Sequence, residues 1–360
     1  MTTNPPTQRH YDCLDGLRAV LALYVVMHHC WIGVYLPHAT TLSPAFLVFV
    51  LGRYAVCFFL VLSGFCLALP TLPGGFTLEC GLIPFLRRRA WRILPPYYFA
   101  LVLSILVDLP INHLSGPMWS MMLPVTWINT ASHVLLLHNF MPSHLYKING
   151  AFWSIPIEWQ IYFFFPLLLL GWRRLGPGAA TVLAIVVSLV LELAINDRFQ
   201  RQPCAHFIGL FALGMLAARV GTVAKYARLP WLAILAAAWA AFAATFYVGN
   251  QIAMDLSFGV VASVMLAIMF LYPQGRLHRT LDWKPLVFIG SFSYSIYLVH
   301  APILLILWLA AEPLNTHPNV MCLALLAVGL PLIVALSYLF HLACEKPFLR
   351  LRGRKVVHVP

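Results

Sequence analysis

Charged side chains are scarce in this sequence: they make up 9% of its 360 residues, whereas hydrophobic residues make up 61%. A soluble domain carries roughly 25% charged and roughly 45–50% apolar residues. This composition excludes an ordinary water-soluble fold and favours a chain whose outer surface faces lipid. Internal repeats and low-complexity tracts are also missing, so we expect residues 1–360 to form a single transmembrane domain with no further soluble domain.

Familiar cofactor and metal motifs are missing as well. There is no G-x-S-x-G elbow, Walker loop or dinucleotide fingerprint. The eight cysteines form no C-x-x-C pair, which argues against both a zinc site and a disulfide framework. His133, His138 and His144 do not have the spacing of a metal site on a helix. We therefore expect no bound metal and no resident cofactor.

The formal net charge of +12 does not indicate a nucleic-acid partner. The basic residues form short clusters between apolar runs, as loop residues do in membrane proteins. If the chain crosses the membrane ten times, most of the 23 basic residues fall on the side of the N-terminus. The positive-inside rule then predicts that both termini are cytoplasmic, with a short segment at 1–13 and a basic tail at 344–360.

Ten apolar runs are close to the roughly 20 residues that a helix needs to cross the hydrocarbon layer. We therefore predict an all-α, polytopic membrane helical bundle of about ten transmembrane helices, the sixth of which is short. The longest outer connection, 112–152, contains several prolines and tryptophans, and we expect it to lie at the membrane interface. The runs are 14–33, 46–69, 93–111, 153–171, 179–195, 204–219, 231–248, 254–272, 286–309 and 320–343.

Polar side chains in the first run are informative, because a charge at the centre of a membrane helix costs roughly 2.5–3.5 kcal/mol. Since each residue turns a helix by about 100°, Arg18 and His29 differ by about 20° in direction. Asp15 falls on the same stripe, whereas His28 points elsewhere. A salt bridge at the helix start explains Asp15 and Arg18 equally well, but His29 lies inside the apolar run.

Glu158 lies five residues inside the fourth run, about 7.5 Å below the outer surface. His29 lies at about the same depth, so the two side chains could meet across a shared cavity. The carboxylate would then hold the imidazole in one tautomer. The alternative is an interfacial ion pair between Glu158 and Arg53, and both arrangements could hold together.

A cluster of arginines, Arg87–Arg92, follows the second run in what we read as a loop. Arg89 and Arg92 are neighbours if this segment is helical, and paired guanidinium groups suit phosphates. A plain positive-inside anchor is the other interpretation.

The ninth run carries a stripe of hydroxyl groups and an imidazole, from Ser293 through Tyr297 to His300. Such a stripe either packs helices together or contacts a substrate.

Six blocks, in order between residues 11 and 348, together resemble the membrane-bound acyltransferase 3 family. At two positions where many members carry acidic residues, this chain has Cys57 and Trp159 instead, so no carboxylate can act there. The blocks are Leu14–Ala19 with Arg18-x10-His29, Phe58–Phe65, Arg89–Pro95, Trp153-Ser154 with Glu158 and Tyr162, Ser293–His300, and Glu345–Phe348.

The resemblance implies an acyl-coenzyme A donor on the cytoplasmic side, acetyl-coenzyme A by default. It implies a hydroxyl acceptor on an exported or surface glycan or glycolipid, and a place in a bacterial inner membrane. The family's histidine corresponds to His29, its arginine to Arg18, and its loop arginines to Arg89 and Arg92, beside which Arg88 is a further donor-binding candidate.

Our hypothesis makes His29 the general base and Glu158 the residue that orients it, with Asp15 and Arg18 beside the donor. A covalent acyl-imidazole is the alternative route. A proton-coupled transporter or flippase of a glycan or lipid precursor is the competing class, since it uses the same intramembrane groups. The oligomeric state, including a homo-oligomer, is left open. Candidates for substrate or oxyanion contact are Arg53, Ser63, Trp153, Ser154, Tyr162, Ser293, Tyr297 and His300.

Overall fold

The computed structural model describes residues 11–38, 43–114, 119–199, 203–314 and 316–351. This part of the chain is built from helices and contains no strand, which confirms the predicted all-α class. The lipid core offers no water to hydrogen-bond the backbone, so a crossing segment must satisfy its own peptide groups. The predicted terminal segments fall largely on residues 1–10 and 352–360, which lie outside the described residues.

Within the described residues, nine segments are long and apolar enough to cross a membrane, and α8 is a shorter apolar helix. This confirms the multi-pass bundle, with the short helix at the sixth run. The longer helices are α1 (Asp12–His38), α2 (Gly52–Ala68), α3 (Leu82–Asp108), α6 (Ile155–Leu175), α7 (Pro177–Phe199), α8 (Phe207–Gly221), α9 (Trp231–Val248), α10 (Gln251–Leu271), α13 (Ser293–Ala311) and α15 (Leu330–Phe340). The shorter ones are α4 (Trp119–Met122), α5 (Trp127–Val134), α11 (Arg276–Leu281), α12 (Lys284–Gly290), α14 (Pro318–Ala324) and α16 (Lys346–Leu351).

The arginine cluster does not lie in a loop, contrary to the sequence-based prediction. Helix α3 begins at Leu82, well before the apolar run at 93–111, and carries Arg87–Arg92 within its first turns. Gly81 precedes it with φ of 75°, a conformation that suits glycine, and so allows the chain to turn into the helix there. Hydropathy alone places the boundary too late, because an arginine-rich turn is polar and still helical.

The ninth apolar run, 286–309, is also not one helix. Helix α12 ends at Gly290 and α13 begins at Ser293. A Cβ atom on Gly290 would lie 1.8 Å from the carbonyl oxygen of Asp15 in α1. The break therefore occurs where α12 passes against the backbone of α1, a contact that sequence periodicity does not reveal.

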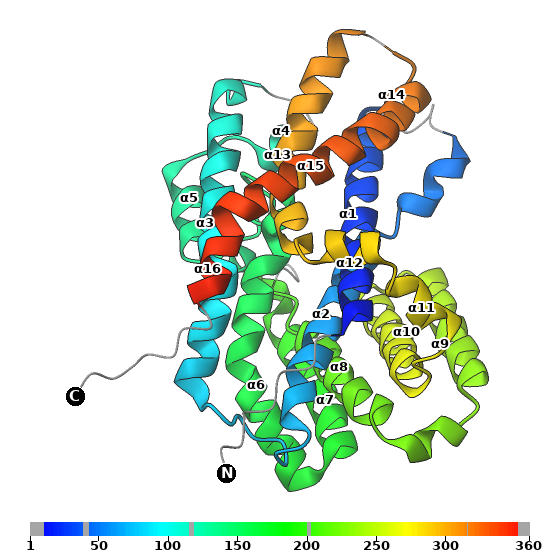
Figure 1. The fold of residues 1–360 in the computed structure, drawn as a ribbon. Helices are drawn as coiled ribbons and strands as arrows, with labels where there is room; N and C mark the ends of the chain where they lie inside the picture. Colours follow the sequence, from blue (N-terminus) through cyan, green and yellow to red (C-terminus); the bar gives the residue numbers. More distant parts are fainter. Residues whose placement is uncertain (1–10, 39–42, 115–118, 200–202, 315, 352–360) are drawn as a thin grey trace.

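The last crossing is a continuous helical segment, Pro318–Leu349, that contains two π-helical stretches. They are Leu325–Gly329 and His341–Glu345, and each ends two residues before a proline, Pro331 or Pro347. Proline lacks an N–H group and clashes with the carbonyl four residues earlier, which a wider π turn relieves. In Figure 1 this orange-to-red segment slants across α13 and α3, both of which it contacts.

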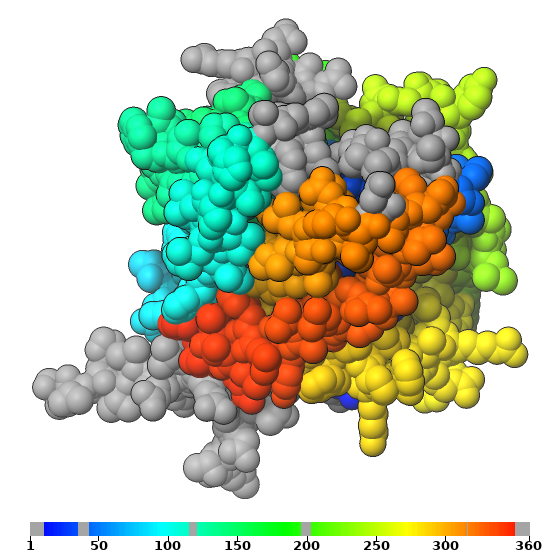
Figure 2. Space-filling model, turned by 90° about the horizontal axis from the view of Figure 1, so that it is seen from above, coloured from blue at the N-terminus to red at the C-terminus, as the bar shows by residue number. Residues whose placement is uncertain are grey.

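Helix α1 passes through the interior of the bundle and contacts α2, α12 and α13. Near its start, Gly16 packs against the backbone of Leu281. Near its other end, the Cys30 thiol lies 3.8 Å from the carbonyl oxygen of Leu325. The start of α1 and α11 therefore share one end of the bundle, and Cys30 lies toward the opposite end. Figure 2 shows α3 in cyan beside α13 in orange and α15–α16 in red along one face.

Candidate active site

A cavity of about 110 Å³ lies between α1, α2, α3, α6 and α13, and it contains most of the polar side chains that the sequence singled out. Its wall combines apolar side chains with three arginines, one carboxylate and several hydroxyl groups. This is the composition of a ligand site, where a few polar groups orient a mainly apolar partner. The polar lining residues are Arg18, Ser63, Cys66, Arg89, Arg92, Ser154, Glu158, Tyr162, Ser293, Tyr294 and Tyr297.

Arg18 enters this cavity from α1. Its guanidinium donates to the Asp15 carboxylate one turn earlier, and its Nη2 donates to Cys66 Sγ at 3.1 Å. The salt bridge at the helix start is therefore present, and Arg18 lines the cavity as well. Asp15 is not among the lining residues, so it orients Arg18 rather than facing the cavity.

Arg89 is the least satisfied of the cavity's polar groups. Its buried Nε has no hydrogen-bond partner among the described residues. Its guanidinium lies 5.8 Å from the ring centre of Phe85 and 5.9 Å from that of Tyr162. A buried donor without a partner costs roughly 1–3 kcal/mol, and more when it is charged, so Arg89 is poised to receive an anionic group.

The other two arginines of this cluster differ in position. Arg92 lines the cavity together with Arg89, one turn along α3. Arg88 is not among the lining residues, and its guanidinium contacts the Cys80 sulfur instead. With Arg18, Arg89 and Arg92 set against Glu158, the cavity carries an excess of positive charge.

Glu158 is held by hydroxyl groups rather than by an arginine. Tyr162 OH donates to its Oε1 at 2.5 Å, and Ser63 Oγ donates to the same oxygen at 3.2 Å. The alternative pairing with Arg53 is wrong, because Arg53 binds Asp255, with its Nη2 2.7 Å from Oδ2.

His29 has a different partner from the one the sequence suggested. Its Nδ1 lies 2.9 Å from the carbonyl oxygen of Val25 and 3.3 Å from Nε2 of His300, whose Nδ1 lies 3.0 Å from the carbonyl of Ile296. A carbonyl can only accept, so both Nδ1 atoms carry the proton. His300 Nε2 is then an acceptor, and His29 Nε2 carries a free lone pair, which is the form a general base needs.

The expected meeting of His29 and Glu158 is not found. Neither the hydrogen bonds nor the ring contacts of the described residues join them, and His29 is not among the cavity-lining residues. Tyr297 links the two regions, since it lines the cavity and its ring centre lies 5.9 Å from that of His300. Helix α13 thus brings the histidine pair next to the cavity. The spacing of residues within α1 could not reveal this arrangement, because His300 belongs to another helix.

A fixed pair of hydroxyl groups marks this junction. Tyr297 OH donates to the carbonyl of Ala151 at 2.7 Å, so Ser154 Oγ, also 2.7 Å away, donates to the tyrosine oxygen. Ser154 ends η5 (Gly150–Ser154), which leads directly into α6 and Glu158. Trp153 points elsewhere: it is not a lining residue, and the Arg53 guanidinium lies 5.2 Å from its ring centre.

A buried group of charges outside the cavity was missed by the sequence reasoning. Asp255 accepts from Arg53 and lies 3.0 Å from Nε2 of His206, whose Nδ1 lies 3.2 Å from Glu192. Arg53 and His206 thus contact the buried carboxylates of Asp255 and Glu192. The sequence does hold a signal for this group, because Glu192 and Asp255 are carboxylates inside apolar runs.

The histidines of the outer connection have structural partners. The rings of His133 and His138 stack with centroids 3.9 Å apart, and His133 Nδ1 donates to the carbonyl of Asn129. Burial is the main cause that lowers the pKa of His133 to about 4 and that of His138 to about 3. His144 contacts Ser132, with Nδ1 3.0 Å from its Oγ. These rings are therefore neutral packing elements at physiological pH.

Comparison with known proteins gives a consistent answer. A family model described as an acyltransferase domain matches residues 11–342. The chain is 24% identical over 324 residues to Nodulation protein 10 of Rhizobium leguminosarum bv. viciae, covering 83% of this chain and 84% of that protein. It is 25% identical over 337 residues to O-acetyltransferase OatA of Staphylococcus aureus, covering 82% of this chain and 51% of OatA.

A third relative is the putative peptidoglycan O-acetyltransferase YrhL of Bacillus subtilis, 24% identical over 83% of this chain and 49% of YrhL. This chain thus spans about half the length of OatA and YrhL. No solved structure matches it.

Proposed function

The chain belongs to the membrane-bound acyltransferase 3 family, and we propose that it moves an acetyl or other acyl group from coenzyme A to a sugar hydroxyl of an exported or surface glycan. The observation that carries this proposal is the cavity itself. Arg89, whose buried Nε has no hydrogen-bond partner among the described residues, lines this cavity. Tyr297 lines it as well and contacts His300, the partner of His29. The names of OatA and YrhL support an O-acetyl transfer, and that of YrhL supports a glycan as the acceptor.

The arginines are the proposed donor subsite. Arg89 and Arg92 would hold phosphates of coenzyme A, since guanidinium groups bind phosphates through paired, charge-assisted hydrogen bonds. The apolar side chains of the cavity wall suit the slender, uncharged pantetheine arm better than a nucleotide. We therefore assign the nucleotide to the arginine end and the thioester to the end lined by Ser154 and Tyr297.

The histidine pair is the proposed catalytic base. His29 Nε2 takes the proton of the acceptor hydroxyl while its oxygen attacks the thioester carbonyl, and the carbon–sulfur bond then breaks. The departing thiolate takes that proton back from the imidazolium, so the enzyme ends unchanged. His300 is a positioning residue that accepts from His29 Nδ1, which keeps Nε2 free for the base role. Ser154 and Tyr297 would have to redirect their hydroxyl hydrogens, now donated to Tyr297 and to the Ala151 carbonyl, before they could stabilise the oxyanion.

The test is label transfer in membranes that contain the full chain, radiolabelled acetyl-coenzyme A and a crude glycan fraction. His29→Ala should lower transfer roughly 10²–10⁴-fold, the usual contribution of a general base. His28→Gln is the matched control, because His28 Nδ1 contacts the Phe49 carbonyl and should leave transfer nearly unchanged. Label that reaches glycan equally well with His29→Ala removes the proposal, and uptake of label without transfer favours a carrier.

We place the protein in a bacterial inner membrane with both termini in the cytoplasm, so that the arginine end of the cavity meets cytoplasmic coenzyme A. The uneven distribution of basic residues supports this orientation.

A further inference from the structure

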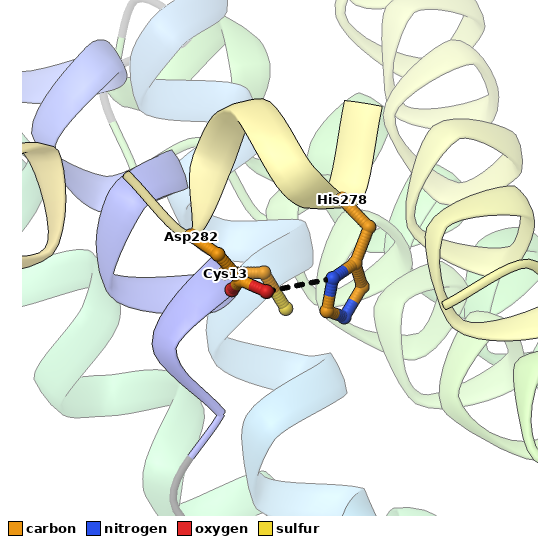
Figure 3. Close-up of side chains that lie close together, drawn as sticks. All are labelled: Cys13, His278 and Asp282. Atoms are coloured by element: carbon orange, nitrogen blue, oxygen red, sulfur yellow. Dashed lines mark ion pairs between the residues drawn. The ribbon is translucent and has the colours of Figure 1, made fainter. Parts of the chain in front are cut away.

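Three metal-ligand side chains from distant parts of the chain meet at the start of α1. Cys13 lies in the first turn of α1, His278 lies in α11, and Asp282 ends that helix. Figure 3 shows the three side chains pointing toward one another. Their sulfur, nitrogen and oxygen atoms all lie within 4.8 Å of one another. The cavity described above includes none of them.

The contact between His278 and Asp282 is not an ordinary hydrogen bond. Nδ1 of His278 lies 3.0 Å from Oδ2 of Asp282, yet this buried nitrogen has no hydrogen-bond partner among the described residues. The two atoms are close enough for a hydrogen bond, but the imidazole is not oriented to form one. In the tautomer that carries its proton on Nε2, both atoms direct electron pairs to the space beside the Cys13 sulfur, as the ligands of a metal ion do.

We propose that Cys13, His278 and Asp282 bind one Zn²⁺ ion. Thiolate, imidazole and carboxylate are the ligand types that zinc accepts together, whereas a thiolate disfavours calcium and magnesium. Ligands of a tetrahedral zinc lie about 3.3–3.6 Å apart, given bonds of about 2.0–2.3 Å. The three atoms need to move by only about an ångström to reach these positions, and the Cys13 thiol proton passes to solvent on binding.

The exposure of the three side chains fits three protein ligands and one water. Cys13 is fully buried, whereas the side chains of His278 and Asp282 are 18% and 38% exposed. The sulfur thus closes the inner side of the site, and the outer side is open for a water molecule as the fourth ligand.

The surrounding backbone holds the ligands in place without the metal. A Cβ on Gly16 would lie 1.8 Å from the carbonyl oxygen of Leu281, the residue before Asp282. Gly290 meets the backbone of Asp15 equally closely. These two contacts fix the start of α1 against α11 and α12. Zinc would therefore fasten a preformed junction, five residues along α1 from Arg18.

No metal site was expected from the sequence, because the three ligands do not stand at the spacing of a known motif. Cys13 and His278 belong to opposite ends of the chain, so spacing cannot reveal them. The proposal does not depend on the acyltransferase reaction. Its test therefore measures metal content and spectra, which stay informative if the proposed function fails.

The experiment uses the full chain, purified in detergent with a tag that lacks histidine, stripped by a chelator and then exposed to Zn²⁺. We expect about one tightly bound zinc per chain by mass spectrometry of the metal. Cys13→Ser, His278→Gln and Asp282→Asn should each weaken binding by more than the roughly 10–100-fold that loss of a supporting residue costs. Cys80→Ser and His113→Gln, both at exposed positions, are the matched controls.

Cobalt gives a second, independent readout. Co²⁺ bound at this site should show the ultraviolet charge-transfer band of a cobalt–thiolate bond, and Cys13→Ser should abolish it while Cys80→Ser retains it. If Cys13→Ser does not fold, two other results still support the site. The His278→Gln variant should lose zinc, and the control variants should keep the cobalt–thiolate band of the wild type. Zinc content in the His278→Gln and Asp282→Asn variants equal to that of the wild type overturns the proposal, as does a wild-type chain without a cobalt–thiolate band.

Discussion

At the scale of single residues, position within the cavity separates neighbours that look alike in sequence. Arg88 and Arg89 are adjacent, yet Arg89 carries a buried Nε without a partner and Arg88 contacts Cys80 outside the cavity wall. His28 and His29 are adjacent too, and only His29 meets His300. A helix turn of about 100° per residue is the physical reason, since it sends consecutive side chains to different neighbours.

This difference makes a prediction about the donor. Replacing Arg89 and Arg92 together by alanine should raise the apparent KM for the acyl-coenzyme A at least tenfold and change the acceptor's KM little, because each charge-assisted hydrogen bond to phosphate contributes roughly 1.5–3 kcal/mol. Steady-state kinetics of transfer would measure both constants. Arg88→Ala is the internal control and should leave the donor's KM unchanged. An unaltered donor KM in the double variant would show that Arg89 and Arg92 only fix the orientation of the chain in the membrane and do not bind the donor.

Single residues could be selected from the sequence, but their pairings could not. Polar groups in apolar runs are visible by their cost in lipid, which is why Arg18, Glu158 and His29 stand out without a structure. Which group faces which depends on helices that are remote in the chain. His300 is 271 residues from His29, and Asp255 is 202 residues from Arg53. Spacing within one helix carries no information about such partners.

At the scale of helices, close backbone packing joins α2 to α8. A Cβ on Gly214 would lie 1.8 Å from the carbonyl oxygen of Val61, and one on Gly64 would lie 2.0 Å from that of Phe211. In a membrane, helices gain little from the hydrophobic effect, and close backbone contact through small residues takes its place. Helix α2 carries Ser63 and Cys66 into the cavity, so this contact also sets the position of one wall.

Gly214→Ala should therefore destabilise the protein by about 1–3 kcal/mol, the usual cost of forcing extra volume into a packed interior, because the obstacle is backbone and cannot rotate away. The apparent midpoint of thermal unfolding in detergent would report this loss. Gly33→Ala in α1 is the matched control: no atom of the described residues lies within 4 Å of its added Cβ, so its midpoint should stay within error of the wild type or rise slightly. Equal midpoints for Gly214→Ala and the wild type would show that α2 and α8 can separate at little cost.

Helix boundaries show why part of the fold escapes the sequence. Run length follows directly from the thickness of the lipid core, and so the class and the number of apolar runs could be read in advance. The early start of α3 and the break between α12 and α13 could not, since the first concerns polar turns and the second a contact with α1. The π stretches of the last crossing are a response to Pro331 and Pro347 that hydropathy does not register.

At the scale of the whole molecule, the proposed reaction requires access from both sides of the membrane. The arginine end of the cavity has to meet a donor made in the cytoplasm, and the histidine pair has to meet an acceptor from the other side. The positive-inside rule assigns those sides from the basic residues of the connections. It predicts that the connection between α2 and α3, with its exposed Cys80, is cytoplasmic, and that the connection between α3 and α6, with its exposed Ser143, is outside.

An impermeant maleimide checks this assignment on spheroplasts. Cys80 should be labelled only after the membrane is permeabilised, since the reagent cannot reach a cytoplasmic thiol. In a Cys80→Ser background, Ser143→Cys should be labelled in intact spheroplasts to nearly the same extent as in permeabilised ones. The reverse pattern would turn the molecule over in the membrane and place the arginine end where no coenzyme A is made. The cavity would then need another donor, even though its charge and its histidine pair stayed the same.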